Sequence, residues 1–238
     1  MLPAVIERVY ATGCVAVPGG GTTEVFPDSL PHRHAEALVD LIAATGARTT
    51  LEVGVRFGVS TVVIATALLE GGSHIGVDLS IEPAARALVD EAGVGDRVQL
   101  VAQPSELALP ALLADGAGGT LDLVVVDGDH RFDHAFVDGF YGFHLLREGG
   151  TLVLHDLWIP SVRRAAAALC AAFPLVVLDS PINVLFLRSD GPDRRSYQHD
   201  RVPDDDALPA GRAPDGARFD STPPVVLSRL HSMLDRRP

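Results

Sequence analysis

The 238-residue sequence contains no lysine, so all 19 of its basic residues are arginine. This absence excludes any mechanism in which a lysine amine acts as the general base. Aspartate and glutamate outnumber the arginines by 31 to 19, which gives a net charge of −12. Such a negative balance argues against a nucleic acid as the partner, because its phosphate backbone needs a basic surface.

Cysteines and long apolar runs are also scarce. The only two cysteines, Cys14 and Cys170, lack the spacing of metal ligands, so we expect reduced thiols. There is no run of about 18 apolar residues and no signal-peptide pattern, so we expect a cytoplasmic protein without a membrane partner. The apolar share of 47% is sufficient for one α/β domain with a complete core.

Strand and helix patterns alternate along the middle of the chain. Strands are predicted at 49–53, 74–78, 98–102, 121–127 and 151–155, and helices at 31–46, 60–69, 82–92, 105–114, 133–146 and 161–173. Continuous apolar strands such as Leu121–Val126 indicate a parallel sheet that is covered on both faces. A tight turn joins two further predicted strands, 175–178 and 183–188, which must therefore be antiparallel.

Composition divides the chain into three regions. Residues 1–30 contain three consecutive glycines and several prolines and are predicted to form an irregular N-terminal arm or lid. Residues 31–188 contain the α/β pattern. Residues 189–238 form a tail that is rich in Asp, Arg and Pro, with a short helix predicted at 223–234.

The stretch 49–80 has the layout of a nucleotide-binding crevice. A glycine turn follows the first strand, and an acidic residue ends the second strand, where it can accept hydrogen bonds from ribose hydroxyls. Glycines let the backbone approach a ligand closely, and the start of the next helix attracts a polar or anionic group. The residues of this pattern are Glu52, Gly54, Gly58, Ser60 and Asp78.

The spacing Glu52-x-Gly54-x-x-x-Gly58 differs from the G-x-G-x-x-G pattern of dinucleotide dehydrogenases. It resembles the first motif of the class I S-adenosylmethionine (SAM)-dependent methyltransferases, E/D-x-G-x-x-x-G. The resemblance covers residues 31–188 and implies a Rossmann-like, doubly wound, seven-stranded α/β sheet, mostly parallel with an antiparallel terminal strand. It also implies the following SAM contacts: Glu52, Gly54, Gly58 and Ser60 at the methionine end, Asp78 at the ribose, Gln103 and Ser105 at the adenine, and Asp127 as a further positioning group.

Acidic and histidine side chains follow the next two strands of the predicted sheet. Neighbouring strands lie about 4.8 Å apart, so Asp127, His155 and Asp156 are close enough to share one cation.

The segments VDGDH and GGTLVLHD resemble the metal-dependent small-molecule and sugar O-methyltransferases, including the branch that methylates macrolide sugars. This resemblance implies Mg²⁺ on Asp127, His155 and Asp156. The middle position is usually acidic in that family, and His155 shifts the preference toward Mn²⁺. The alternative is that Asp156 only caps a turn and that His155 packs in the crevice.

His130 is the candidate general base, with Asp127 beside it in the catalytic loop. Related catechol-type enzymes use a lysine there, whereas the macrolide-sugar branch has a histidine at the corresponding point. A purely structural hydrogen bond to the loop is the alternative for His130. His32 and His34 are not expected to reach the site. Trp158 either covers the substrate or belongs to the core.

The sequence therefore predicts SAM-dependent, metal-assisted methyl transfer to a hydroxyl of a sugar or glycoside, in polysaccharide or antibiotic tailoring, by a homodimer. A phenolic acceptor is the nearest alternative. A metal-free N-methyltransferase, a non-catalytic SAM-binding module and an NAD-dependent oxidoreductase remain as further alternatives.

Overall fold

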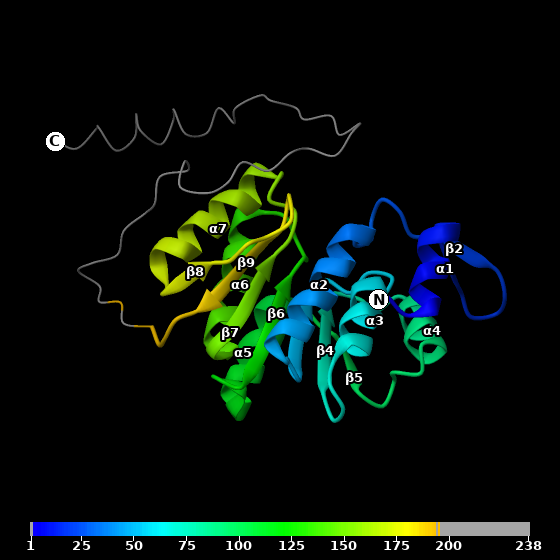
Figure 1. Cartoon of the computed structure of the whole chain (residues 1–238), viewed down its shortest axis with the longest axis horizontal. Coiled ribbons are helices and arrows are strands. Elements are labelled where there is room, and N and C mark those ends of the chain that lie inside the picture. The colour runs from blue at the N-terminus through cyan, green and yellow to red at the C-terminus, as the bar shows by residue number, and fades with distance from the viewer. Residues whose placement is uncertain (1, 194, 196–238) are drawn as a thin grey trace.

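The computed structural model describes residues 2–193 and 195, and its helices and strands alternate as predicted (Figure 1). The elements are α1 (Ala4–Thr12), β1 (Cys14–Ala16), β2 (Thr22–Glu24), α2 (His32–Thr45), β3 (Thr49–Val53), α3 (Val59–Ala67), β4 (Ser73–Asp78), α4 (Pro83–Glu91), β5 (Val98–Ala102), α5 (Ser105–Leu112), a π-helical turn (Leu113–Ala117), β6 (Leu121–Val126), α6 (Phe132–Leu145), β7 (Leu146–Leu154), α7 (Pro160–Ala172), β8 (Leu175–Val177) and β9 (Leu185–Ser189). The short helix predicted at 223–234 and most of the predicted tail lie outside the described residues.

Seven strands form one sheet in the order β5-β4-β3-β6-β7-β9-β8. The strands β5, β4, β3, β6 and β7 are parallel to one another, whereas β9 is antiparallel to both of its neighbours, β7 and β8. This arrangement confirms the predicted doubly wound sheet with an antiparallel terminal strand. Because the parallel strands end at one edge, the segments after β3, β4, β6 and β7 meet there.

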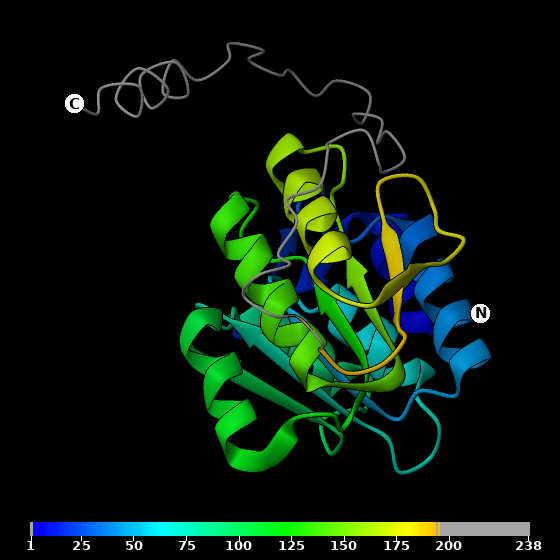
Figure 2. The same ribbon diagram turned by 90° about the vertical axis from the view of Figure 1, so that its left-hand side faces the viewer.

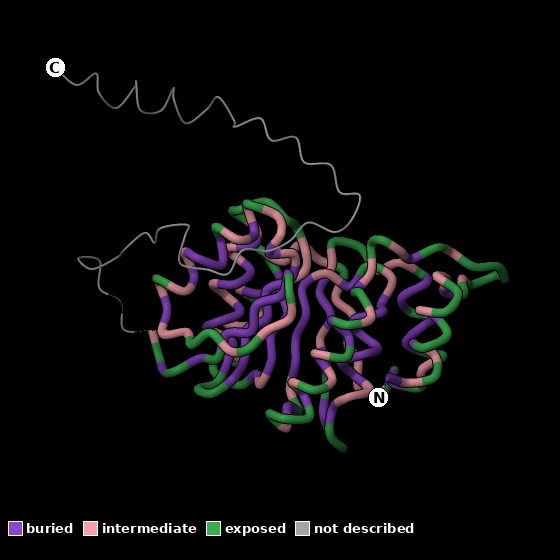
Figure 3. Tube along the Cα trace, turned by 45° about the horizontal axis from the view of Figure 1, so that its top comes forward, coloured by how far each residue is buried: buried purple, intermediate pink, exposed green. Residues whose placement is uncertain are grey.

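Buried apolar residues form one cluster on each face of the sheet. Helices lie on both sides of the sheet (Figure 2), and the trace is buried along most of the central strands (Figure 3). The helices α1–α4 cover one face and α5–α7 cover the other. Alternate residues of β6 divide between the two clusters: Leu123 and Val125 face α1–α4, whereas Val124 and Val126 face α5–α7. The central strands are therefore held rigidly from both sides, which fixes the positions of the residues at their ends.

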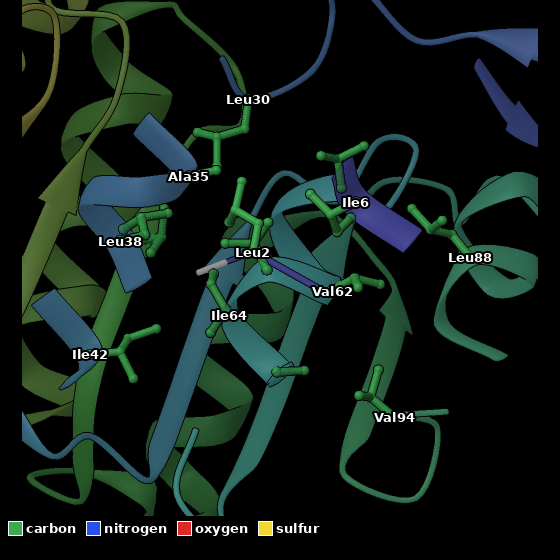
Figure 4. Close-up of a cluster of buried hydrophobic side chains, with 14 of the residues drawn as sticks. Leu2, Ile6, Leu30, Ala35, Leu38, Ile42, Val62, Ile64, Leu88 and Val94 are labelled. Carbon is green, nitrogen blue, oxygen red and sulfur yellow. The ribbon is translucent and has the colours of Figure 1, made fainter. Parts of the chain in front are cut away.

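The N-terminal residues are more regular than predicted. Helix α1 and the β1–β2 hairpin occupy most of residues 1–30, and the glycine run lies in the hairpin turn. Leu2 and Ile6 are buried in the same cluster as Val62 of α3 and Leu88 of α4 (Figure 4). The prediction of an irregular arm is wrong in this respect, because a helix with buried apolar residues packs onto the domain here.

Two of the sequence-based expectations concern cysteines and membranes. Both Cys14 and Cys170 are free, as predicted. Within the described part of the chain, no helix is long and apolar enough to cross a bilayer.

Candidate active site

The turn after β3 is built on two glycines. Gly54 has φ 99°, and a Cβ at this position would lie 2.1 Å from the carbonyl oxygen of Asp127. Gly58, with φ 80°, is the N-cap residue of α3, and no side chain caps that helix. The first amides of α3 can therefore bind a polar or anionic group. Ser60 lies in this first turn and is almost fully buried.

Glu52 does not face the crevice as predicted. Its side chain is buried with 1% exposure, and its carboxylate accepts a hydrogen bond from the Thr61 hydroxyl. The same oxygen lies 3.2 Å from Nε2 of His74 on β4. Glu52 therefore ties β3 to α3 and β4 beneath the glycine turn, and its contribution to a ligand site is to hold that turn in place.

Asp78 closes the turn from the neighbouring strand. Its Oδ2 atom accepts hydrogen bonds from the backbone amides of Val55 and Arg56, both at 2.9 Å. The backbone amide of Gln103 donates to the carbonyl of Asp78 at 2.8 Å, so the loop that leads to Ser105 lies beside it. The structure thus places Asp78, Gln103 and Ser105 at the predicted edge. Their contacts with ribose and adenine stay predictions.

His130 lies between two carboxylates. Its Nε2 atom is 3.1 Å from Oδ2 of Asp156 and 3.9 Å from Oδ1 of Asp127. One ligand atom from each of these three residues lies within 4.8 Å of the others, so the three can hold one metal ion. This geometry follows from the parallel pairing of β6 and β7, after which Asp127 and Asp156 stand at adjacent strand ends.

His155 belongs to a different, buried group. Its Nδ1 atom is 3.0 Å from Oδ1 of Asp127, and its Nε2 atom is 2.8 Å from Nδ1 of His34. On its other side, Nε2 of His34 lies 3.0 Å from the backbone carbonyl oxygen of Ile182 and 3.3 Å from Nε of Arg33. Both ring nitrogens of His155 thus have a partner inside the protein.

Metal binding by His155 stays a prediction. Its ring nitrogens lie against Asp127 and His34. The candidate ligand set that the structure brings together contains His130 beside Asp127 and Asp156. Metal binding itself stays a prediction.

The charges of the site follow from this arrangement. The carboxylates of Asp127 and Asp156 raise the pKa of His130 to about 9. Burial lowers the pKa of His155, but Asp127 and Asp156 raise it more strongly, to about 10. Burial and the neighbouring His155 lower the pKa of His34 to about 4, so this ring is neutral. At neutral pH, two carboxylates thus face two imidazolium groups.

Backbone strain is concentrated at the same edge. Three residues other than glycine have a positive φ among the described residues, namely Arg56 at 48°, Asp156 at 57° and Asn183 at 70°. Arg56 lies in the glycine turn, Asp156 follows β7, and the carbonyl of Asn183 accepts the amide of Leu157 at 3.1 Å. Strained residues of this kind cluster at functional sites, so this signal agrees with the side-chain geometry.

A cavity of about 580 Å³ opens beside Asp156. Trp158 lies on its wall, and the indole N–H donates to Oδ1 of Asp156 at 2.8 Å. The remaining lining residues are Pro31, His32, Arg33, His34 and Asn183. Sequence reasoning placed His32 and His34 outside the site. No local pattern links the start of α2 to the end of β7, so only the fold brings these residues together.

Comparison with known proteins agrees with this geometry. Residues 51–157 match a family model described as a methyltransferase domain. Residues 51–157 therefore resemble a methyltransferase domain. The match includes the glycine turn, His130 and Asp156, and it confirms the enzyme class that was predicted for the domain.

Similar proteins and structures extend this result. The chain is 35% identical over 127 residues to the catechol O-methyltransferase domain-containing protein 1 of Mus musculus. This match covers 52% of this chain and 48% of that protein. It is 33% identical over 119 residues to the catechol O-methyltransferase of Mycobacterium tuberculosis, with coverage of 49% and 51%. The chain thus spans about half the length of the curated relatives it matches.

A solved O-methyltransferase from Bacillus cereus, in complex with S-adenosylhomocysteine (SAH), has the same fold. The TM-score is 0.63 at 17% identity, and the match covers 79% of this chain and 91% of that chain. The methyltransferase domain therefore has the predicted class I fold.

A buried acid inside the methyltransferase domain provides a test of its stability. Asp138 on α6 is 1% exposed, and neither of its carboxylate oxygens has a hydrogen-bond partner in the described structure. Burial raises its pKa from 3.8 to about 6. Because the folded state holds this proton more tightly than the unfolded state, the free energy of unfolding should fall as the pH rises from about 4 to 6.

Asp138→Asn removes this titration. The variant should be more stable than the wild type at pH 7.5 by about 2–3 kcal/mol, and the difference should vanish near pH 4. Urea unfolding of both proteins at the two pH values measures the effect. An advantage of equal size at pH 4 and 7.5 would show that Asp138 does not titrate in this range.

Proposed function

We propose that this protein transfers a methyl group from SAM to a hydroxyl of a small phenolic acceptor. The observation that carries the proposal is the position of His130 between Asp127 and Asp156, at the same sheet edge as the glycine turn. The names of both relatives, from mouse and from M. tuberculosis, refer to catechol O-methyltransferase. They support a phenolic acceptor more than the predicted sugar, for which they give no support.

The glycine turn fits the donor. The uncapped start of α3 offers backbone amides to the carboxylate of the methionine moiety. The Oδ2 atom of Asp78 accepts hydrogen bonds from the turn and Oδ1 accepts one from the amide of Ser80 at 3.2 Å, so this carboxylate is held at the edge where a ribose would lie. When bound, SAM supplies an electrophilic methyl group on a sulfonium centre.

His130 is the group that receives the proton. The acceptor oxygen attacks the methyl carbon, the carbon–sulfur bond breaks to release SAH, and the hydroxyl proton moves to Nε2 of His130. This atom is directed at the Asp156 carboxylate, 3.1 Å away, which stabilises the imidazolium that forms. With a pKa of about 9, His130 holds a proton at neutral pH unless the charge of the two carboxylates is neutralised.

A divalent metal would provide that neutralisation. Asp127, Asp156 and His130 supply oxygen and nitrogen donors close enough for one ion, and these donors suit Mg²⁺ or Mn²⁺. Such a metal would also lower the pKa of the acceptor hydroxyl. Since His130 cannot be both ligand and base at one moment, we assign the metal to the two carboxylates and the proton to His130.

The test is a methyl-transfer assay with SAM and catechol, with and without Mg²⁺ or Mn²⁺. We expect formation of the methyl ether, and we expect EDTA to lower the rate at pH 7.5 by at least about tenfold because His130 then keeps its proton. A panel of sugars serves as the competing acceptor class. Turnover that EDTA does not change would contradict the metal. Turnover of sugars alone would overturn the phenolic acceptor.

A further inference from the structure

The cavity beside Asp156 is formed by three segments that are distant in sequence. Pro31, His32, Arg33 and His34 come from the start of α2, Asp156 and Trp158 follow β7, and Asn183 lies before β9. Its volume of about 580 Å³ is within the usual range for small-molecule sites. Because Asp156 is shared by the cavity and the candidate catalytic cluster, a molecule in the cavity can place one group beside His130.

The cavity wall carries a carboxylate and a guanidinium. Asp156 contributes the carboxylate, and the exposed Arg33 contributes the guanidinium. An anionic substituent on a molecule bound in the cavity would be attracted to Arg33.

Arg33 is available for such an interaction. Its Nε atom lies 3.3 Å from Nε2 of His34, and no carboxylate in the described part of the chain pairs with it. The neighbouring cavity residue His32 differs, since its ring lies 3.5 Å from Glu7 and 3.4 Å from Glu36. The terminal nitrogens of an arginine can bind a carboxylate through two parallel hydrogen bonds.

Trp158 contributes an aromatic ring to the cavity wall. Its indole N–H donates to Asp156 at 2.8 Å, so the orientation of this half-buried ring is fixed relative to the catalytic cluster. A fixed aromatic ring on the wall that also carries Asp156 and Arg33 favours a flat ligand that packs against it.

We propose that the acceptor is an aromatic hydroxy acid, with its hydroxyl at Asp156 and its carboxylate bound by Arg33. This inference rests on the proposed function, and it narrows the acceptor from phenols in general to phenols that carry a carboxylate. A neutral phenol would occupy the same cavity without the contact to Arg33 and would bind more weakly.

The test compares protocatechuate, its neutral methyl ester and catechol. Trp158 is the only tryptophan of the chain, so quenching of its fluorescence, corrected for ligand absorbance, measures binding without turnover. In the full-length protein with SAH bound, we expect Arg33→Gln to raise the Kd of protocatechuate about tenfold. The Kd values of the ester and of catechol should change less than twofold.

The control is Arg86→Gln, which removes an exposed arginine on α4, away from the cavity lining. It should leave all three Kd values unchanged. Equal binding of acid and ester by the wild type, or an equal loss of both in Arg33→Gln, would overturn the carboxylate site. Methyl transfer is measured in parallel on the same ligands. Arg33-dependent binding of the acid without turnover would support the site and overturn the proposed methyl transfer, so the two can fail separately.

Discussion

Replacing His130 with glutamine should lower kcat about 10²–10⁴-fold, because the variant has no group to accept the hydroxyl proton. The affinity for SAH, measured by calorimetry, should stay within about twofold, since His130 lies beside the carboxylates and not in the glycine turn. Glutamine preserves the size and the hydrogen bond to Asp156. The loss therefore measures the proton acceptor rather than the packing of the loop.

Two further readouts separate the roles of His130. If it is the base, the wild-type rate without metal should rise with pH up to about 9, because only the neutral ring accepts a proton. The variant should lose this dependence and keep its Mn²⁺ affinity. A large fall in Mn²⁺ affinity would instead show that His130 is a metal ligand. His144→Gln, at the far end of α6, is the matched control and should retain full activity.

Replacing Gly54 with alanine should abolish SAH binding and lower the free energy of unfolding by at least about 3 kcal/mol. Two effects destabilise the folded state when a side chain is added at this position. The backbone has φ 99°, which a residue with a Cβ rarely adopts, and that Cβ would lie 2.1 Å from the backbone oxygen of Asp127. Relief requires the loop that carries Asp127 to move, and the catalytic cluster moves with it.

Gly71→Ala isolates the backbone contribution. Gly71 also has a positive φ, 75°, but no atom lies within 4 Å of the position that an added Cβ would occupy. This substitution should lower the free energy of unfolding by only about 1–2 kcal/mol and leave SAH binding intact. Chemical denaturation and calorimetry on both variants measure the difference. Equal destabilisation by the two substitutions would mean that the close approach of Gly54 to Asp127 is not rigid.

Much of the fold could be predicted because its signals are local. Continuous apolar runs marked the parallel strands, and a short turn marked the antiparallel strand β9. The ends of neighbouring strands also brought Asp127 and Asp156 together as expected, because parallel pairing places residues at one edge. The place of His130 at this site could be predicted because it follows Asp127 by three residues in the same loop. The homodimer, the absence of a nucleic-acid partner and the tail remain predictions.

The rest of the site depends on contacts that no short pattern encodes. His34 contacts His155 across 121 positions of sequence, and this contact gives His155 a buried partner that no local pattern predicts. The N-terminal helix was missed for a related reason, since glycines and prolines in the following hairpin masked the apolar spacing of α1.

The acceptor cavity draws most of its wall from outside the matched domain. Arg33 and His34 precede residues 51–157, and Asn183 follows them, whereas the glycine turn and His130 lie within. Under the proposed function, the residues for SAM and for the proton lie in one uninterrupted stretch, whereas most residues of the cavity proposed for the acceptor lie in the segments that flank it. Exchange of these flanking segments would then change the acceptor while leaving the glycine turn and His130 in place.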